Sequence, residues 1–326
     1  MAYIYEKIIG KRSYYYLRMD ETINKKKIVK DIAYLGNDLS KINLKDLMSN
    51  HKYKKEIKKS YKTISKFINS KYYINKAKTK KLKKEEYLTK EQQTVLEAIR
   101  LHFKDRFLKL DKQTQKEVYN NFIVSYAYNT TSIEGNTIPM KDVEKILNKG
   151  ITPKNRELRE VYDLRNTKEA FFYFFNKKKL DKKLIIDIHD NLLKEVDERK
   201  GFRNHDIRVL FSRFKASPHF LIEHEIKNLL EWYNKNLKLN PFVLGTIFHH
   251  KFEKIHPFSD GNGRSGRLLL NWTLLKNKYP PLIITKKNRT QYLDSLEKCD
   301  KKGDYKPLID FLVTEYEKGY WENFNV

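Results

Sequence analysis

The spacing of apolar residues divides the chain into a β-rich start and a long helical remainder. Three runs in the first 37 residues alternate apolar with polar positions and are rich in Tyr, Ile and Val: Ala2 to Ile9, Ser13 to Met19 and Lys27 to Leu35. Turn-forming residues, among them Gly10 and Gly36, follow these runs. The pattern predicts a three-stranded meander, which needs a packing partner because three short strands alone are marginally stable.

Residues 41–84 show a helical pattern in a very basic context. Apolar residues recur three or four positions apart from Ile57 to Ile68, which gives one apolar face. The same segment holds 16 Lys and Arg residues, with Asp46 and Glu56 as its only acidic residues. Two interpretations remain open: a solvated lysine face on a packed helix, or a surface that binds nucleic acid or a protein partner.

From Tyr87 onward the pattern is helical almost to the end. The expected helices cover 91–109, 113–128, 141–147, 155–175, 182–195, 223–236, 241–255, 265–276, 289–298 and 305–316. One stretch differs, because Ile207 to Phe211 followed by Ser217-Pro218 predicts a short β-hairpin. We therefore expect a mainly α protein: a helical bundle with a short β-hairpin over 91–326, preceded by a small β-meander plus basic helical domain over 1–90.

Charge and cysteine usage narrow the function classes. The 326 residues carry 68 Lys and Arg against 41 Asp and Glu, a net charge of +27, and residues 1–90 alone hold 25 against 9. This balance favours anionic partners, although a lysine-rich genome would also raise it. The single cysteine, Cys299, excludes a disulfide framework and a cysteine-cluster zinc site. Without an apolar run of spanning length or a signal-peptide core, we expect a cytoplasmic protein with no membrane partner.

A loop that runs into a helix carries the densest chemical signal, between Ile255 and Arg267. Gly261 and Gly263 allow consecutive backbone N–H groups to turn inward and bind an anion. The following helix adds unpaired N–H groups and the positive end of its dipole. Arg264 and Arg267 lie three positions apart, so both can reach one polyphosphate.

Two further residues of this loop fit phosphate chemistry. Pro257 ends the preceding helix and leaves His256 at its exit, where the imidazole can act as a base for a hydroxyl nucleophile. Asp260 offers oxygen ligands beside the glycines, where a Mg²⁺ ion bridging phosphates would lie. Ordinary turn chemistry explains the glycines alone. It does not explain a histidine, an acid, two glycines and two arginines at this spacing.

The string from His256 to Arg267 resembles the signature of the Fic family, His-x-Phe-x-(Asp/Glu)-Gly-Asn-Gly-Arg-x-x-Arg, at every specified position. The flanking segments Phe248 to Ile255 and Leu268 to Asn271 are also similar to the helices of that family. Gly201-Phe202-Arg203, with the hairpin after it, resembles the family's flap, which holds the target segment by strand pairing. The resemblance covers residues 95–318 and leaves residues 1–90 outside.

The resemblance implies transfer of AMP from ATP to a Ser, Thr or Tyr hydroxyl of a target protein bound along the flap near 207–220. His256 would take the hydroxyl proton, and Asp260 would hold Mg²⁺ between the α- and β-phosphates. Arg264 would bind the inner phosphates and Arg267 the γ-phosphate. The other nucleotide contacts would come from the backbone N–H groups of Gly261, Asn262, Gly263 and Arg264 and, on the nucleoside side, from Asn271.

A second string resembles the inhibitory motif of the same family, (Ser/Thr)-x-x-x-Glu-(Gly/Asn). Thr130, Glu134 and Gly135 occupy its fixed positions, at the end of a helix expected over 113–134. The resemblance implies that Glu134 pairs with Arg267, so that ATP binds with its α-phosphate misaligned for attack. On the residues alone, an ordinary helix end with Gly135 just beyond it is the better account, and the family resemblance is what favours the inhibitory motif.

Three alternatives stay open at this point. The family resemblance also implies that the same glutamate can support removal of AMP from modified protein. The basic residues 1–90 could make the chain a nucleic-acid-associated regulator, or could form a docking module that selects the target protein. Family members of this kind often pair, so a homodimer is a further option.

Overall fold

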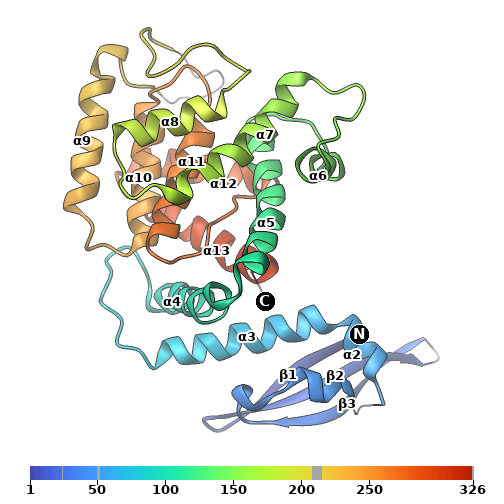
Figure 1. The fold of residues 1–326 in the computed structure, drawn as a ribbon. Coiled ribbons are helices and arrows are strands. Elements are labelled where there is room, and N and C mark those ends of the chain that lie inside the picture. Colours follow the sequence, from blue (N-terminus) through green and yellow to red (C-terminus); the bar gives the residue numbers. More distant parts are fainter. Residues whose placement is uncertain (24, 50–51, 208–214, 325–326) are drawn as a thin grey trace.

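The computed structural model describes residues 1–23, 25–49, 52–207 and 215–324. A helical bundle forms most of the molecule, and a small sheet lies at one end of it (Figure 1). None of the helices in the described ranges is long and apolar enough to cross a bilayer. The expected mainly α architecture with an N-terminal β-meander is confirmed.

The sheet consists of β1 (Ala2–Ile9), β2 (Arg12–Ile23) and β3 (Lys26–Gly36), in the order β1-β2-β3 with both pairs antiparallel. Alternating residues explain why it packs on one side only. Ala2, Ile4 and Leu17 are buried against the following helices, and their sequence neighbours point the other way. The three strands match the expectation, and β2 extends four residues beyond it.

Three helices follow the sheet: α1 (Leu44–Ser49), α2 (Lys54–Lys59) and α3 (Tyr61–Lys78). Helix α3 lies between the sheet and the bundle (Figure 1). Its Ile64 and Ile68 belong to the core beneath the sheet, whereas Tyr73 and Ala77 belong to the large core of the bundle. The apolar interior is therefore shared across residues 61–78, and the boundary at residue 90 stays a prediction.

The bundle is built from ten helices in the described ranges. They are α4 (Lys90–Asp105), α5 (Lys112–Ile133), α6 (Met140–Lys149), α7 (Leu158–Tyr173), α8 (Lys182–Leu192), α9 (Ile222–Lys235), α10 (Pro241–Ile255), α11 (Asn262–Lys276), α12 (Arg289–Lys302) and α13 (Lys306–Asn323). Short 3-10 turns link several of them. Every expected helix is present, with ends that differ by a few residues.

Helices α10 and α11 form the centre of the bundle. Both are buried along nearly their whole length; α10 and the second half of α11 are rich in apolar residues, whereas the first half of α11 buries polar and charged side chains such as Arg264 and Arg267. Gly245 lets them pack closely, since a Cβ there would lie 2.9 Å from the Leu270 side chain. The loop that joins these two helices is thus held between two rigid elements.

Two segments need a separate comparison with the sequence-based prediction: the start of α11 and the predicted β-hairpin. Helix α11 begins at Asn262, three residues earlier than expected, because Gly261 adopts a left-handed conformation (φ 75°) as its N-cap and the next residues continue directly into the helix. The expected hairpin falls mainly on residues 208–214, which lie outside the described residues. On either side of them, Ile207 and residues 215–218 form no regular structure.

Candidate active site

The loop between α10 and α11 begins at His256 and ends at the first turn of α11. His256 follows the last helical residue in a left-handed conformation (φ 51°), which turns the chain sharply out of α10. The Asn262 side chain then braces the loop, because its Oδ1 accepts from Phe258 N at 2.9 Å and its Nδ2 donates to Phe258 O at 2.8 Å. Two apolar helices and one buried amide therefore fix the loop conformation.

The first turn of α11 supplies the donors expected for an anion. The N–H groups of Asn262, Gly263 and Arg264 precede the first intrahelical bond, in which Ser265 N donates to Gly261 O at 2.9 Å. They lie at the positive end of the helix dipole. Asn262 thus has a structural side chain in addition to the predicted backbone role.

Arg267 is buried at 3% exposure and meets the end of α5. Its Nε donates to Thr130 Oγ1 at 2.8 Å, and its Nη2 donates to the Thr130 carbonyl at 3.0 Å and to Glu134 Oε1 at 2.6 Å. Thr130 and Glu134 lie one helical turn apart on α5, so both can reach the same guanidinium. The predicted pairing of Glu134 with Arg267 is therefore present in the structure.

Gly263 makes room for this ion pair. A Cβ at residue 263 would lie 2.3 Å from Glu134 Oε1 and 2.8 Å from Arg267 Nη1. The glycine thus has a second use besides exposing its N–H group, because a larger residue would collide with the glutamate. Gly135, just after the glutamate, adopts φ 109°, which marks the end of the helix, in agreement with the expected helix-end position.

The buried surroundings set the charges of the site. Burial lowers the pKa of His256 below its usual value, and the nearby Arg203 lowers it further, whereas a backbone hydrogen bond to Glu253 and the charge of Glu134 oppose this shift. His256 is therefore neutral at pH 7, as a base must be. Burial also raises the pKa of Glu253 to about 8, so this carboxyl is mostly protonated at pH 7. Glu134 consequently supplies the negative charge beside Arg267.

Helix α7 contributes two residues, Arg159 and Asp163, that belong to neither of the two sequence motifs. Arg159 Nη2 donates to Asp260 Oδ2 at 2.5 Å, and Arg264 Nη1 donates to the half-buried carboxylate of Asp163. Both belong to one face of α7, since they are four positions apart. That spacing is visible in the sequence, but nothing in the sequence shows which loop this face contacts.

Asp260 is the residue predicted to hold a Mg²⁺ ion, and in the structure its carboxylate pairs with Arg159 and lies 3.5 Å from Arg264 Nη2. Asp260 is partly exposed at the start of α11, and one of its oxygens accepts from Gly261 N at 2.5 Å. Mg²⁺ is commonly bound by one or two carboxylates together with substrate phosphates rather than by a cage of protein ligands. No group of three or more His, Cys, Asp or Glu side chains with metal-binding geometry occurs among the residues described. A site completed by phosphate oxygens agrees with both observations.

Arg203 ties the region of the expected flap to the catalytic loop. Its side chain is fully buried, its Nε donates to His256 O at 2.9 Å, its Nη1 donates to His205 O at 2.8 Å, and its Nη2 donates to Ser217 O. The two residues His205 and Ser217 lie on either side of residues 208–214. One guanidinium therefore joins His205 and Ser217 to His256.

Asn271 lies deeper in the bundle than the other predicted site residues. Its Nδ2 donates to Leu282 O at 3.0 Å and its Oδ1 accepts from Leu282 N at 2.7 Å. It borders a cavity of only about 10 Å³, which is too small for a nucleoside. The nucleoside contact predicted for Asn271 would require the segment around Leu282 to move, and it stays a prediction.

The fold and this loop define a class of protein: a helical bundle whose central helix begins at an anion-binding turn, with a neutral histidine beside it. Comparison with known proteins gives that class a name. Residues 179–274 match the model of the Fic/DOC family. This match includes the complete string from His256 to Arg267.

Relatives and solved structures agree with this match. The chain is 30% identical over 202 residues to the protein adenylyltransferase fic-1 of Caenorhabditis elegans, covering 59% of this chain and 39% of the relative. It is 30% identical over 214 residues to the protein adenylyltransferase Fic of Aedes aegypti, covering 62% and 41%. A Fic-domain signalling protein from Bacteroides thetaiotaomicron has the same fold with a TM-score of 0.62 at 22% identity, covering 69% of this chain and 94% of that protein.

A solved fragment of C. elegans Fic-1 is similar as well, with a TM-score of 0.59 at 25% identity over 69% of each chain. Residues 179–274 are therefore similar to a Fic domain, as the sequence resemblance implied. It spans about two fifths of the length of the curated relatives it matches.

Proposed function

We propose that this chain is an auto-inhibited protein adenylyltransferase, which transfers AMP from ATP to a hydroxyl group of a target protein. The ion pair between Glu134 and Arg267, across the start of α11, is the observation that carries the proposal. Arg267 belongs to the string of residues that would bind the phosphates of ATP. Glu134 places a carboxylate beside it, where the outermost phosphate would bind. The adenylyltransferase names of the relatives at 30% identity support the same chemistry.

The proposed reaction is an in-line displacement at the α-phosphorus. Neutral His256 accepts the proton of a Ser, Thr or Tyr hydroxyl on the target. The hydroxyl oxygen forms a bond to the α-phosphorus, the bond from that phosphorus to the oxygen bridging to the β-phosphate breaks, and pyrophosphate leaves. Such transfer depends mostly on positioning and charge stabilisation, which suits a site rich in donors.

The phosphate donors come from the start of α11. The backbone N–H groups of Gly261, Asn262, Gly263 and Arg264, together with the Arg264 guanidinium, would hold the α- and β-phosphates. For its N–H to turn to phosphate, Gly261 must leave Asp260, and Arg264 must turn from Asp163. Arg267 would hold the γ-phosphate, which requires that Glu134 give up its hydrogen bond. Competition for one guanidinium is thus the proposed basis of inhibition.

Asp260 would hold the magnesium ion, which supplies charge neutralisation for the phosphates and the leaving pyrophosphate. Arg159 pairs with this carboxylate in the structure, so its side chain must turn away when the ion binds. The flap side of the site would hold the target. A cleft of about 190 Å³ beside Asp260 is lined in part by Phe202, Arg203 and Asn204, and it could hold part of the target.

Isotope placement in ATP tests the proposed reaction. The Glu134→Gly variant, which lacks the proposed inhibitory carboxylate, is incubated with Mg²⁺ and either α-labelled or γ-labelled ATP, with an unrelated hydroxyl-rich protein and a lysate as acceptors. Label from the α-position and none from the γ-position on protein is the expected result. Label from the γ-position instead would mean phosphate transfer and would contradict the proposal.

Removal of AMP from a modified protein is a second candidate, favoured by one observation. The Glu134 carboxylate is 42% exposed and its charge influences His256, so it lies where it could bind a water molecule next to the site. Release of AMP from a modified acceptor by the unaltered chain, but not by the Glu134→Gly variant, would support this direction.

Arg203 gives a prediction about the target side of the site. In an activated background, Arg203→Ala should lower transfer by about tenfold or more and raise the KM for the acceptor, while ATP affinity stays unchanged. Arg203→Lys should not restore activity, because one ammonium group cannot replace a fork that serves three carbonyls. Steady-state kinetics with both substrates measure this, and an unchanged KM for the acceptor would contradict it.

The pKa of His256 gives a prediction about pH. A base is active in its neutral form, and burial places the pKa of His256 below 6.5. The midpoint of the acidic limb of the rate profile should therefore lie below pH 6.5. Removing Glu134, whose charge raises the pKa of His256, should move the acidic limb of the rate profile to lower pH. A rate profile of the Glu134→Gly variant whose acidic limb lies above pH 6.5 would contradict the assignment.

A further inference from the structure

The sheet of residues 1–36 has an outer face, turned away from the helices, that the proposed activity does not use. Helices α2 and α3 contact one face of the sheet, through residues of β1 and β2 such as Ile4 and Leu17, and the sheet lies on the outside of the molecule (Figure 1). Cross-strand partners show which residues share this outer face, because Tyr5 pairs with Tyr16, and Tyr16 pairs with Tyr34. We call it the tyrosine face, and its aromatic members are Tyr3, Tyr5, Tyr14, Tyr16 and Tyr34.

The tyrosine rings lie open to solvent rather than in a core. Tyr34 is 58% exposed, and the other four are partly exposed. The rings of Tyr16 and Tyr34 lie 5.2 Å apart, and the Arg18 guanidinium lies over the Tyr5 ring at 3.4 Å. On the inner face of the same sheet, by contrast, mainly aliphatic side chains fill the space under α3. The aromatic content of the outer face therefore exceeds what packing of this sheet requires.

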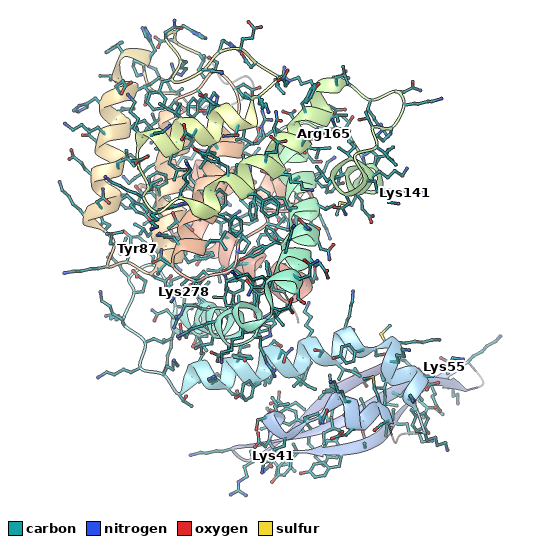
Figure 2. The ribbon with its side chains drawn as sticks, viewed as in Figure 1. Lys41, Lys55, Tyr87, Lys141, Arg165 and Lys278 are labelled. Carbon is teal, nitrogen blue, oxygen red and sulfur yellow. The ribbon has the colours of Figure 1, made fainter. Side chains whose placement is uncertain are left out.

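Positive charge exceeds negative charge on the sheet, where Arg18 pairs with Asp31 and Lys27 with Asp20. Residues 1–36 hold eight Lys and Arg against four Asp and Glu. Lys7 is the cross-strand partner of Tyr14, and Arg12 begins the same strand two residues earlier. The helices behind the sheet are more basic still, and exposed lysines such as Lys41 and Lys55 lie at the surface of this unit (Figure 2).

We propose that the tyrosine face binds single-stranded nucleic acid, with bases stacked on the tyrosine rings and phosphates held by the surrounding lysines and arginines. Every base has a flat π-face, so a row of partly exposed rings on an open sheet suits unpaired bases. Phosphates supply the negative charge that this basic unit lacks. A protein helix would need an apolar surface instead, whereas tyrosine hydroxyls and charged side chains alternate across these strands. The proposal does not depend on AMP transfer.

Fluorescence anisotropy with the full chain tests this proposal. The probes are a labelled 20-nucleotide single-stranded RNA of mixed sequence, the DNA strand of the same sequence, and the DNA duplex, each over a series of salt concentrations. The full chain should bind both single strands more tightly than the duplex, and its affinity should fall linearly with salt on a log–log plot. Absence of binding to either strand at low salt, or tighter binding of the duplex, would overturn the proposal.

Variants separate stacking from general charge. Replacing Tyr5, Tyr16 and Tyr34 together by Ala should weaken single-strand binding by about tenfold or more without changing the salt slope, whereas replacing them by Phe should preserve it. The matched control is Tyr61→Ala, an exposed tyrosine of the same unit outside the face, which should bind like the parent.

A second set of variants changes the charge around the tyrosine face and leaves its aromatic side chains in place. Lys7→Gln with Arg12→Gln keeps every ring and should both weaken binding and reduce the salt slope. Equal binding by the Ala and Phe triple variants would overturn the stacking assignment. Sedimentation of the Ala variant as a smaller species than the parent would show that the face joins two copies of the chain, and would overturn the proposal as well.

Discussion

The Glu134→Gly variant is expected to transfer AMP at least tenfold faster than the unaltered chain. In the unaltered chain, Glu134 Oε1 accepts a hydrogen bond from the Arg267 guanidinium at 2.6 Å. Removing the carboxylate frees this side of the guanidinium for the γ-phosphate of ATP. A tenfold change corresponds to about 1.4 kcal/mol, within the range expected of a charge-assisted hydrogen bond between a buried arginine and a partly exposed carboxylate. Incorporation of α-label into protein per unit time measures the effect.

The fold should tolerate this change. Glu134 caps the end of α5 and is followed by a glycine, so a second glycine removes no helical turn. Glu134→Gln is the matched control, because it keeps the shape of the side chain and removes its charge. It should give an activity between those of the parent and the glycine variant. Equal transfer rates in all three proteins, with unchanged melting temperatures, would contradict the inhibitory role of Glu134.

Loss of His256 is the second large effect. In the Glu134→Gly background, His256→Ala should lower transfer by about 10²–10⁴-fold, the usual contribution of a general base. ATP affinity should stay unchanged, since the phosphate donors belong to α11 and not to His256. Single-turnover rates and nucleotide titration of the same preparation measure the two quantities.

A second substitution separates chemistry from folding at this position. His256 adopts a left-handed backbone conformation, which alanine tolerates poorly and asparagine tolerates well. His256→Asn should therefore keep the stability of the parent and still lose the transfer activity. Retained transfer in the asparagine variant would contradict the assignment of His256 as the base.

The sequence predicted the outline of the fold because its periodicity is strong. Alternation marked the three strands, and apolar spacing marked every helix from Lys90 onward. The sequence pattern predicts that α11 begins at residue 265, three residues later than in the structure. The reason is that two glycines, Gly261 and Gly263, are typical of a turn. In the structure, one of them begins the helix, and the other occupies its first turn, where an N–H needs no intrahelical partner.

The site could be predicted only as far as its residues are close in sequence. His256, Asp260 and the arginines form one continuous string. The partner of Arg267, Glu134, belongs to a second string and lies 133 residues away, and only the family resemblance links the two. Arg159 and Asp163 form no such string. Their contacts depend on how α7 packs beside α11, which the sequence of either helix does not show.

Side-by-side transfer of α-labelled AMP by three proteins tests the central claim most directly: the parent, Glu134→Gly, and Glu134→Gly with His256→Asn. Mg²⁺, ATP and acceptor proteins are the same in each reaction. Strong labelling of protein by the Glu134→Gly variant, and little by the other two, is the predicted result. Equal labelling by the parent and the Glu134→Gly variant, or undiminished labelling by the double variant, would contradict the account.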